Sequence, residues 1–426
     1  MKITYSKENI NPFGGIYFAD EIISNSGVYK TIQEHLGSRS SQAQYGYADV
    51  IRALLLSSLS GGDCAEDLTQ HLRPYLSKLE DFTVPSADTV LRSQKELATE
   101  KQVYTSQSGV DHECNINMAM NRLLIRLLCD LQQLRPDKTD YTFDYDNQFI
   151  PTDKYDARYS YKKQEGYFPG IASIDNMPVY IENRNGNSNV KFKQEDTLSR
   201  AYGLLEEFGI SVKRSRMDCG SFSEKIISVV EANSELFYIR AQRCNDLYER
   251  IQEIDNWELV EIDNMMYEVA SIEYAPFGGK KSYRYVISRK PHPHGQGDLF
   301  TGDAFVYRAI LTNDREKSNR EVIVFYNARG ASERLFDQMN NDFNWSKLPF
   351  SFLHENSVFM IIMAICRNLF HFLTDFMSTK VDFVKPYFRL KKFIFRFITV
   401  PAKWIKRARS YILKLYTDKP YHLLLT

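Results

Sequence analysis

The ten residues YTFDYDNQFI, from Tyr141 to Ile150, alternate aromatic and polar side chains, which is the pattern of a β-strand. The aromatic residues would face one side of a sheet, and the other side would carry Asp144 and Asp146. A carboxylate on an otherwise aromatic strand is costly unless it binds something. The segment therefore predicts a core strand and the first acid of a candidate site.

Two further acids stand at the ends of expected elements. Asp218 ends a short expected strand that begins at Ser211, and the turn Cys219-Gly220 and a helix follow it. Glu333 begins an expected helix after the expected strand VIVFY (322–326). Ligand sites of open α/β sheets gather at the carboxyl ends of strands. Three converging carboxylates would make a site of hard oxygen ligands, which suits two Mg²⁺ ions, or Mn²⁺, about 4 Å apart.

Each acid alone has a plainer interpretation, because a single Asp after a strand is more often a helix cap or a turn residue. Tyr326 and Arg329 precede Glu333, and all three would share one face if the segment were helical. An arginine there suits phosphodiester chemistry, since a guanidinium can grip a phosphate with two hydrogen bonds. The alternative is a surface pair of Arg329 with Glu333, worth roughly a few tenths of a kcal/mol. The spacing alone leaves both open.

The spacing Y-x2-R-x3-E, from Tyr326 to Glu333, resembles the tyrosine–arginine–glutamate–lysine signature of DDE transposases from bacterial insertion sequences. The segment FDYDNQ (143–148) is similar to the first-aspartate strand of that family, where D-x-D is common in one branch. RMDCGSF (216–222) resembles its second-aspartate motif. The motif around the glutamate is the most specific of the three.

The C-terminal part extends the resemblance. The apolar segment 348–370 and the basic ending 388–416 are similar to the corresponding parts of that branch. The resemblance covers about 141–416 and, more weakly, the N-terminal helices. Asn340 stands where the signature has its lysine, so Lys347 is a candidate for the missing DNA contact.

The resemblance implies a ribonuclease H-like core whose catalytic, metal-binding acids are Asp146, Asp218 and Glu333. Gln148 replaces the usual threonine of the first motif, which leaves Asp144 as an alternative to Asp146. The resemblance also implies that Tyr326 and Arg329 contact the DNA phosphate beside the scissile bond.

The expected fold is therefore α/β: a ribonuclease H-like mixed sheet flanked by helices, with a β-rich insertion and an all-helical N-terminal domain. Helical periodicity supports the last at 47–60 and 116–134, and Phe305–Thr312 with Arg320–Tyr326 is expected to form a hairpin. The expected divisions are a helical domain for DNA-end binding and dimerisation (1–136), the two parts of the core (137–234 and 319–380), the insertion (235–318) and a basic tail (381–426).

The chain carries 54 Lys and Arg against 54 Asp and Glu, but its charges are unevenly placed, with no acid from Phe383 to Thr417. Basic residues interleaved with aromatic ones suit a DNA groove, and they are also typical of a helix on a membrane surface. Pro386 and Pro401 break any long helix, which favours DNA. The expected DNA contacts of the tail are Arg389, Lys391, Lys392, Arg396, Lys403, Lys406 and Arg407.

Six scattered cysteines without a C-x-x-C pair suit a reducing compartment and argue against a structural zinc site. The N-terminus lacks the apolar core of a signal peptide, and the longest apolar run, Val358–Cys366, is shorter than the roughly 20 residues that span a bilayer. No P-loop, H-E-x-x-H or G-x-S-x-G motif is present. We expect a cytoplasmic bacterial protein, associated with the nucleoid when bound to DNA.

These features predict a transposase that uses Mg²⁺ to cut DNA at insertion-sequence ends and to transfer the freed 3′-OH into target DNA. Its expected partners are terminal inverted repeats, target DNA and a second copy of the chain, without a membrane or a nucleotide cofactor. One alternative is a ribonuclease H-like nuclease that only hydrolyses. Others are an inactive, transposase-derived DNA-binding protein and, more weakly, a membrane-surface protein that uses the tail.

Overall fold

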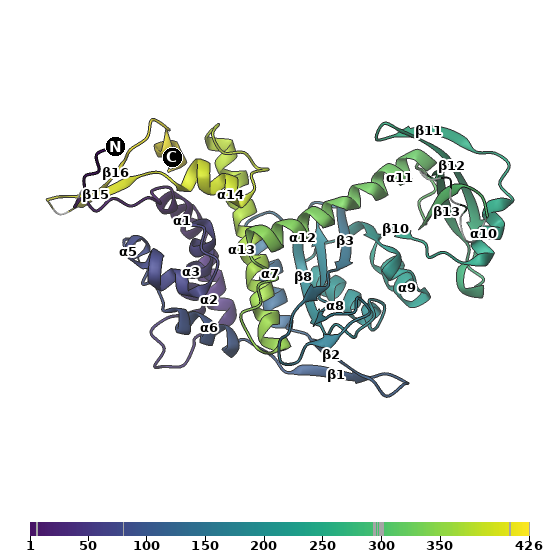
Figure 1. Cartoon of the computed structure of the whole chain (residues 1–426), viewed down its shortest axis with the longest axis horizontal. Helices are drawn as coiled ribbons and strands as arrows, with labels where there is room; N and C mark the ends of the chain where they lie inside the picture. Colours follow the sequence, from purple (N-terminus) through teal and green to yellow (C-terminus); the bar gives the residue numbers. More distant parts are fainter. Residues whose placement is uncertain are drawn as a thin grey trace. The chain divides into compact units, whose positions relative to one another are not determined.

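The chain forms two compact units in a computed structural model that describes residues 1–5, 7–79, 81–292, 295, 297, 302–408 and 410–425 (Figure 1). Unit 1 comprises Met1–Glu100, Asn117–Gln133 and Asp337–Thr426, and unit 2 comprises Lys101–Ile116 and Leu134–Phe336. The candidate acids of the sequence all lie in unit 2.

Unit 2 is built on an 11-stranded sheet with the order β1-β2-β8-β7-β3-β9-β10-β14-β13-β12-β11. A small second sheet has the order β4-β6-β5. The strands are β1 (Lys101–Thr105), β2 (Asp111–Asn115), β3 (Tyr141–Asn147), β4 (Ile150–Pro151), β5 (Arg158–Tyr159), β6 (Glu165–Tyr167), β7 (Gly170–Ile174), β8 (Met177–Arg184), β9 (Val212–Met217), β10 (Leu236–Arg240), β11 (Glu258–Ile262), β12 (Met265–Tyr274), β13 (Tyr283–Pro291) and β14 (Phe305–Thr312).

The centre of the large sheet has the ribonuclease H-like arrangement. Strands β8, β7 and β3 pair antiparallel in that order. Beyond them, β9 pairs parallel with β3, and β10 pairs parallel with β9. Three antiparallel strands followed by two parallel ones make the predicted core, so the expected fold class is confirmed.

Strand β3 shows the alternation that its sequence predicts. On one face, Phe143 is fully buried and stacks on Tyr202 of α8 (Gln194–Glu207), with ring centroids 4.4 Å apart. The Tyr202 hydroxyl also lies 2.8 Å from that of Ser215 on β9. Helices α8 and α9 (Glu224–Asn233) pack against each other on this face. The other face carries the acids.

The other face is covered at β11–β13 by α11 (Asn319–Asn327), which continues through the 3-10 turn η4 (Ala328–Gly330) into α12 (Ala331–Asp342) (Figure 1). The prediction of a strand at Arg320–Tyr326 is therefore wrong. The Ser318 hydroxyl accepts from the amide of Glu321, and the Glu321 carboxylate accepts from the amide of Ser318, which makes a capping box. The helical spacing of its apolar residues then buries Val322, Ile323 and Tyr326 against the sheet.

The strand-rich segment before α11 extends the core sheet. Its first strand, β10, belongs to the core, and α10 (Asn245–Gln252) and β11–β14 follow. Strand β14 returns antiparallel to β10, so the additional strands prolong the sheet beyond the core. The N-terminal region contributes a hairpin as well: β1 pairs with β2, and β2 joins β8 where Cys114 lies opposite Arg184.

Unit 1 is mostly helical, and its 28-residue helix α13 packs against α1, α3, α6 and α7. This helix is long and apolar enough to cross a membrane by length and composition, but 89% of its most apolar window is buried inside the structure, as in a core helix. The helical segments are α1 (Ile16–Asn25), α2 (Val28–Leu36), α3 (Tyr47–Leu59), α4 (Ala65–Asp67), η1 (Leu68–Leu72), α5 (Arg73–Leu76), α6 (Ala87–Glu96), α7 (Met118–Asp130) and α13 (Leu353–Lys380).

The basic tail folds onto unit 1 in short elements. They are α14 (Leu390–Phe393), η5 (Ile394–Ile398), the hairpin of β15 (Ala402–Arg407) with β16 (Ser410–Leu415), and η6 (Tyr421–Leu424). Phe397 is buried and stacks on Phe393, with ring centroids 4.9 Å apart. The described part of the tail contains no long amphipathic helix, so the membrane-surface alternative has no structural support.

Replacing Phe143 with Ala should destabilise unit 2 by about 3–5 kcal/mol, because it leaves a cavity under Tyr202 that the sheet cannot close. Hydrogen exchange of the β3 and β9 amides measures this loss within the unit. Val103→Ala is the matched control, because Val103 on edge strand β1 is 54% exposed. Equal destabilisation by the two substitutions would contradict the packing described.

Candidate active site

Parallel pairing brings one side chain from each of three strands to the same edge of the sheet. At the end of the paired segments, Tyr145 of β3 lies beside Met217 of β9, and Met217 lies beside Ile239 of β10. Because side chains alternate along a strand, the next positions all point to the α11 face. These positions, which we term the edge row, are Asp146, Asp218 and Arg240.

Asp144 lies one step back from the edge row and is committed to a buried ion pair. It is 4% exposed and accepts hydrogen bonds of 2.8 and 2.7 Å from Arg216. Arg216 also donates to the carbonyl of Phe325 on α11, at 2.9 Å. The pair therefore ties the helix to the sheet. Of the two acids that the sequence left open, this arrangement favours Asp146 as the first acid of the site.

Asp146 contacts Arg329 directly. The Arg329 guanidinium donates to the Asp146 carboxylate at 2.9 Å, and both side chains are mostly buried, at 16% and 20% exposure. Burial acts to lower the pKa of Arg329, but the charge and hydrogen bond of Asp146, together with the nearby Tyr326 and Asp218, raise that pKa above its ordinary value. Arg329 is thus a permanent cation aimed at the edge row.

Asp218 is close enough to Asp146 for the two negative charges to repel. Burial raises the pKa of the Asp218 carboxyl, and the charge of Asp146 raises it further, while Arg329 opposes the rise. The carboxylate turns back over Gly220, where a Cβ would meet its two oxygens at 3.0 and 3.4 Å. Glycine therefore permits this approach and leaves the amides of Gly220 and Ser221 as donors to the carboxylate.

Tyr326 holds the strand end next to Asp218. It is 8% exposed, and its hydroxyl donates to the carbonyl of Met217, the residue before Asp218, at 3.2 Å. Burial raises the pKa of Tyr326, so it remains a neutral donor. In this structure its hydroxyl fixes the end of β9.

Glu333 is exposed in the first turn of α12 and does not join the other two acids. In the described part of the chain, no group of three or more His, Cys, Asp or Glu side chains could hold a metal ion. The structure thus brings Asp146 and Asp218 together but not the full expected triad. The pair still fits a hard divalent cation, because carboxylate oxygens are its preferred ligands and a cation would relieve their repulsion.

The other expected DNA contacts lie in unit 1, and several are already engaged. Lys347 pairs with Asp63 at 3.4 Å, and Lys403 pairs with Glu8 at 3.5 Å. Arg389 pairs with both Asp337 and Asp342, at 2.6 Å each. All of these expected contacts except the half-buried Lys403 are exposed, including Lys391, Lys392, Arg396, Lys406 and Arg407.

Sequence reasoning missed basic residues of unit 2 near the edge row. Arg240 belongs to the row itself, and Arg308 lies on the adjacent strand β14. Lys191 donates to the Gln242 side chain at 2.8 Å and is near enough to Asp218 for their charges to interact. The one hint in the sequence is that Arg240 ends the apolar run LFYI (236–239). That pattern does not show which strands lie beside this one, so the sequence could not place Arg240 at the site.

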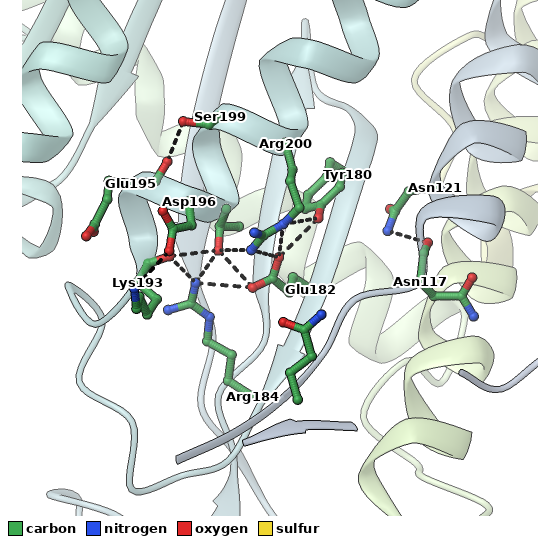
Figure 2. Close-up of polar contacts among 12 residues, drawn as sticks. Asn117, Asn121, Tyr180, Glu182, Arg184, Lys193, Glu195, Asp196, Ser199 and Arg200 are labelled. Atoms are coloured by element: carbon green, nitrogen blue, oxygen red, sulfur yellow. Dashed lines mark hydrogen bonds and ion pairs between the residues drawn. The ribbon is translucent and has the colours of Figure 1, made fainter. Parts of the chain in front are cut away.

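The loop that carries Lys191 is held by a buried polar network, which Figure 2 shows around Glu182 and Arg184. Arg200 donates to the Glu182 carboxylate at 2.8 Å. Arg184 donates to the carbonyls of Phe192 and Lys193, at 2.5 and 3.3 Å. Arg184 belongs to β8 and is only 3% exposed. Its hydrogen bonds therefore anchor the backbone that follows Lys191 to that strand.

The fold and the paired aspartates at its parallel edge define a ribonuclease H-like protein with a metal-compatible acidic site. The family described as transposase DDE domain group 1 matches residues 3–426, so the chain belongs to this family of DDE transposases. A search of curated proteins found no match. Among solved structures, the chain is similar to the piggyBac transposase in a cryo-EM synaptic complex with hairpin DNA. The identity is 12% and the TM-score 0.39, over 93% of this chain and 85% of that chain.

Asp144→Asn should destabilise unit 2 by about 3–5 kcal/mol, because it leaves the buried Arg216 without a matching charge. The matched control is Asp146→Asn, whose more exposed pair with Arg329 should contribute only about 1 kcal/mol. Hydrogen exchange of the β3 and β9 amides compares the two variants. A larger loss for Asp146→Asn would reverse the assignment of the two acids.

Proposed function

We propose that this transposase cuts DNA at the ends of its mobile element and joins the freed 3′ ends to target DNA. The observation that carries the proposal is the juxtaposition of Asp146 and Asp218 at a parallel edge, in a chain of the DDE family. Phosphoryl transfer depends mainly on positioning and charge stabilisation. Two carboxylates, a half-buried arginine and a divalent cation would supply both without a covalent nucleophile.

In this proposal Asp146 and Asp218 hold Mg²⁺, and Glu333 completes the ligand set. Its support is that Glu333 stands four residues after Arg329, in the first turn of α12, although it is exposed and apart from the two aspartates in this structure. When bound, the metal supplies activation of the attacking oxygen and neutralisation of the leaving oxygen. Arg329, which points to the same carboxylate, is placed to donate to a phosphate oxygen.

The chemistry needs no reactant beyond DNA and water. In cleavage, a water oxygen bonds to phosphorus and the bond from phosphorus to the 3′ oxygen breaks, so that oxygen leaves as a 3′-OH and the phosphate stays on the 5′ side. In strand transfer, the 3′-OH oxygen bonds to a target phosphorus, and the target 3′ oxygen leaves with a proton. Tyr326 takes no part in these proton transfers, because its hydroxyl is used to hold Met217.

We also propose action on double-stranded DNA in the bacterial cytoplasm, by a homodimer that holds two element ends. The six cysteines are all free, which agrees with a reducing compartment. Two narrower functions remain as outcomes of the experiment below: hydrolysis without joining, and DNA binding without chemistry.

The purified chain should nick a duplex that carries the DNA flanking its own gene, in the presence of Mg²⁺, and then join the 3′-OH ends to a supercoiled plasmid. Asp146→Asn, Asp218→Asn and Glu333→Gln should each slow nicking at least about a hundredfold, because each removes a proposed metal ligand. Sequencing gels measure the nicks and the joined products.

Asp255→Asn is the matched control, since Asp255 is an exposed acid of the same unit outside the site. Nicking without joined products would favour the nuclease. Binding without nicking by the wild-type chain would favour the non-catalytic protein. Full activity of Glu333→Gln alone would remove Glu333 from the ligand set.

Metal binding can be tested without activity. Mn²⁺ titrated into the chain by calorimetry should bind, and Asp146→Asn or Asp218→Asn should weaken this binding at least about tenfold. Arg329→Gln should strengthen it, because Arg329 is a cation on the same carboxylate. Unchanged Mn²⁺ binding in both aspartate variants would contradict the proposed metal site.

A further inference from the structure

The edge row continues into a line of cations on the α11 face of the sheet. Arg240 pairs in register with Ile310, and Arg308 stands two residues before Ile310, so the two arginines share a face. This is the face of the apolar cluster that contains Tyr238, Ile310 and Tyr326. The two arginines therefore lie on the face of the sheet that packs against Tyr326 of α11.

These cations have little internal compensation. Arg240 and Arg308 form no ion pair with any described residue, and Arg308 is exposed. Burial lowers the pKa of Arg240, and the charges of Arg308 and Arg243 lower it further, which places these groups close enough to repel. A cluster of cations that repel one another at a half-buried position is stabilised by an external anion.

Lys191 adds a third cation near Asp218, on the side of β10. Its ammonium group donates to Gln242, two positions after Arg240, and the buried Arg184 anchors the backbone that follows it. The position of Lys191 is thus set by the fold and not by a free loop. Lys191, Arg240 and Arg308 thus gather on the β10 side of Asp218, where a DNA strand that reaches the edge row would meet them.

We propose that Lys191, Arg240 and Arg308 form a phosphate track that binds the backbone of the DNA strand beside the cleaved bond. The proposal rests on the proposed function, because it takes the edge row as the site of cleavage. The three side chains come from the β8–α8 loop, β10 and β14. Such contacts bind DNA without regard to sequence and position the strand over the acids.

The test measures binding of a short fluorescent duplex of arbitrary sequence between about 50 and 200 mM NaCl. The double variant Arg240→Gln, Arg308→Gln should lower the slope of log K against log salt by about 2, one for each phosphate that is no longer neutralised. Its affinity at low salt should fall at least about tenfold. Arg240→Lys with Arg308→Lys should keep most of the slope, since charge and not shape carries the effect.

Lys225→Gln is the matched control, because Lys225 is an exposed cation on α9, across the sheet from the track. A wild-type slope in the double glutamine variant would overturn the proposal. If that variant does not fold, Arg308→Gln alone decides, since Arg308 is exposed and should lower the slope by about 1. The proposal would also be overturned if the double glutamine variant lost binding of inorganic phosphate but bound DNA as well as the wild type.

Nicking assays separate this proposal from the function on which it rests. On element-end DNA, the double glutamine variant should raise KM about tenfold or more with a small change in kcat, whereas Asp218→Asn should bind DNA and not cut it. If the wild-type chain binds DNA but never cuts, the proposed function fails while the salt series still tests the track. If it cuts and the glutamine variant has wild-type KM and slope, only the track fails.

Discussion

The parallel pairing of β3 with β9, and of β9 with β10, is the constraint on which the site depends. Parallel strands end at the same edge, so one residue from each strand enters a single row: Asp146, Asp218 and Arg240. Two neighbouring carboxylates in a partly buried position repel each other. The protein offsets this repulsion with Arg329 on Asp146 and with backbone amides on Asp218. The same repulsion makes the row a place where a divalent cation would be stabilised.

The sequence was informative where local pattern decides the structure. The alternation of β3 was visible because side chains on a strand repeat every two residues, and it correctly placed Asp144 and Asp146 on one face. It could not tell the two acids apart, because the difference lies in Arg216, which comes from another strand. Nor could it place Arg240 or Lys191, whose neighbours are set by strand order and by a buried network.

The error at Arg320–Tyr326 has a definite physical cause. The run VIVFY is rich in β-branched and aromatic residues, so its intrinsic preference is for a strand. The capping box of Ser318 and Glu321 favours a helix start, and burial of one helical face against the sheet outweighs propensity. The capping signal was present in the sequence. The helix matters for the site, because it brings Tyr326 to the end of β9 and leads directly to Arg329 at Asp146.

A DNA strand that reaches the edge row approaches two negatively charged carboxylates, Asp146 and Asp218. Each phosphate is repelled by Asp146 and Asp218, so cations must compensate before chemistry is feasible. Arg329 cannot serve both the carboxylate and a phosphate oxygen equally well. Metal binding at Asp146 would weaken the hold of that carboxylate on Arg329 and leave its guanidinium available to the phosphate. The acids, the arginine and the metal are therefore coupled, because each changes the charge that the others experience, and the phosphate track would hold the strand while that exchange takes place.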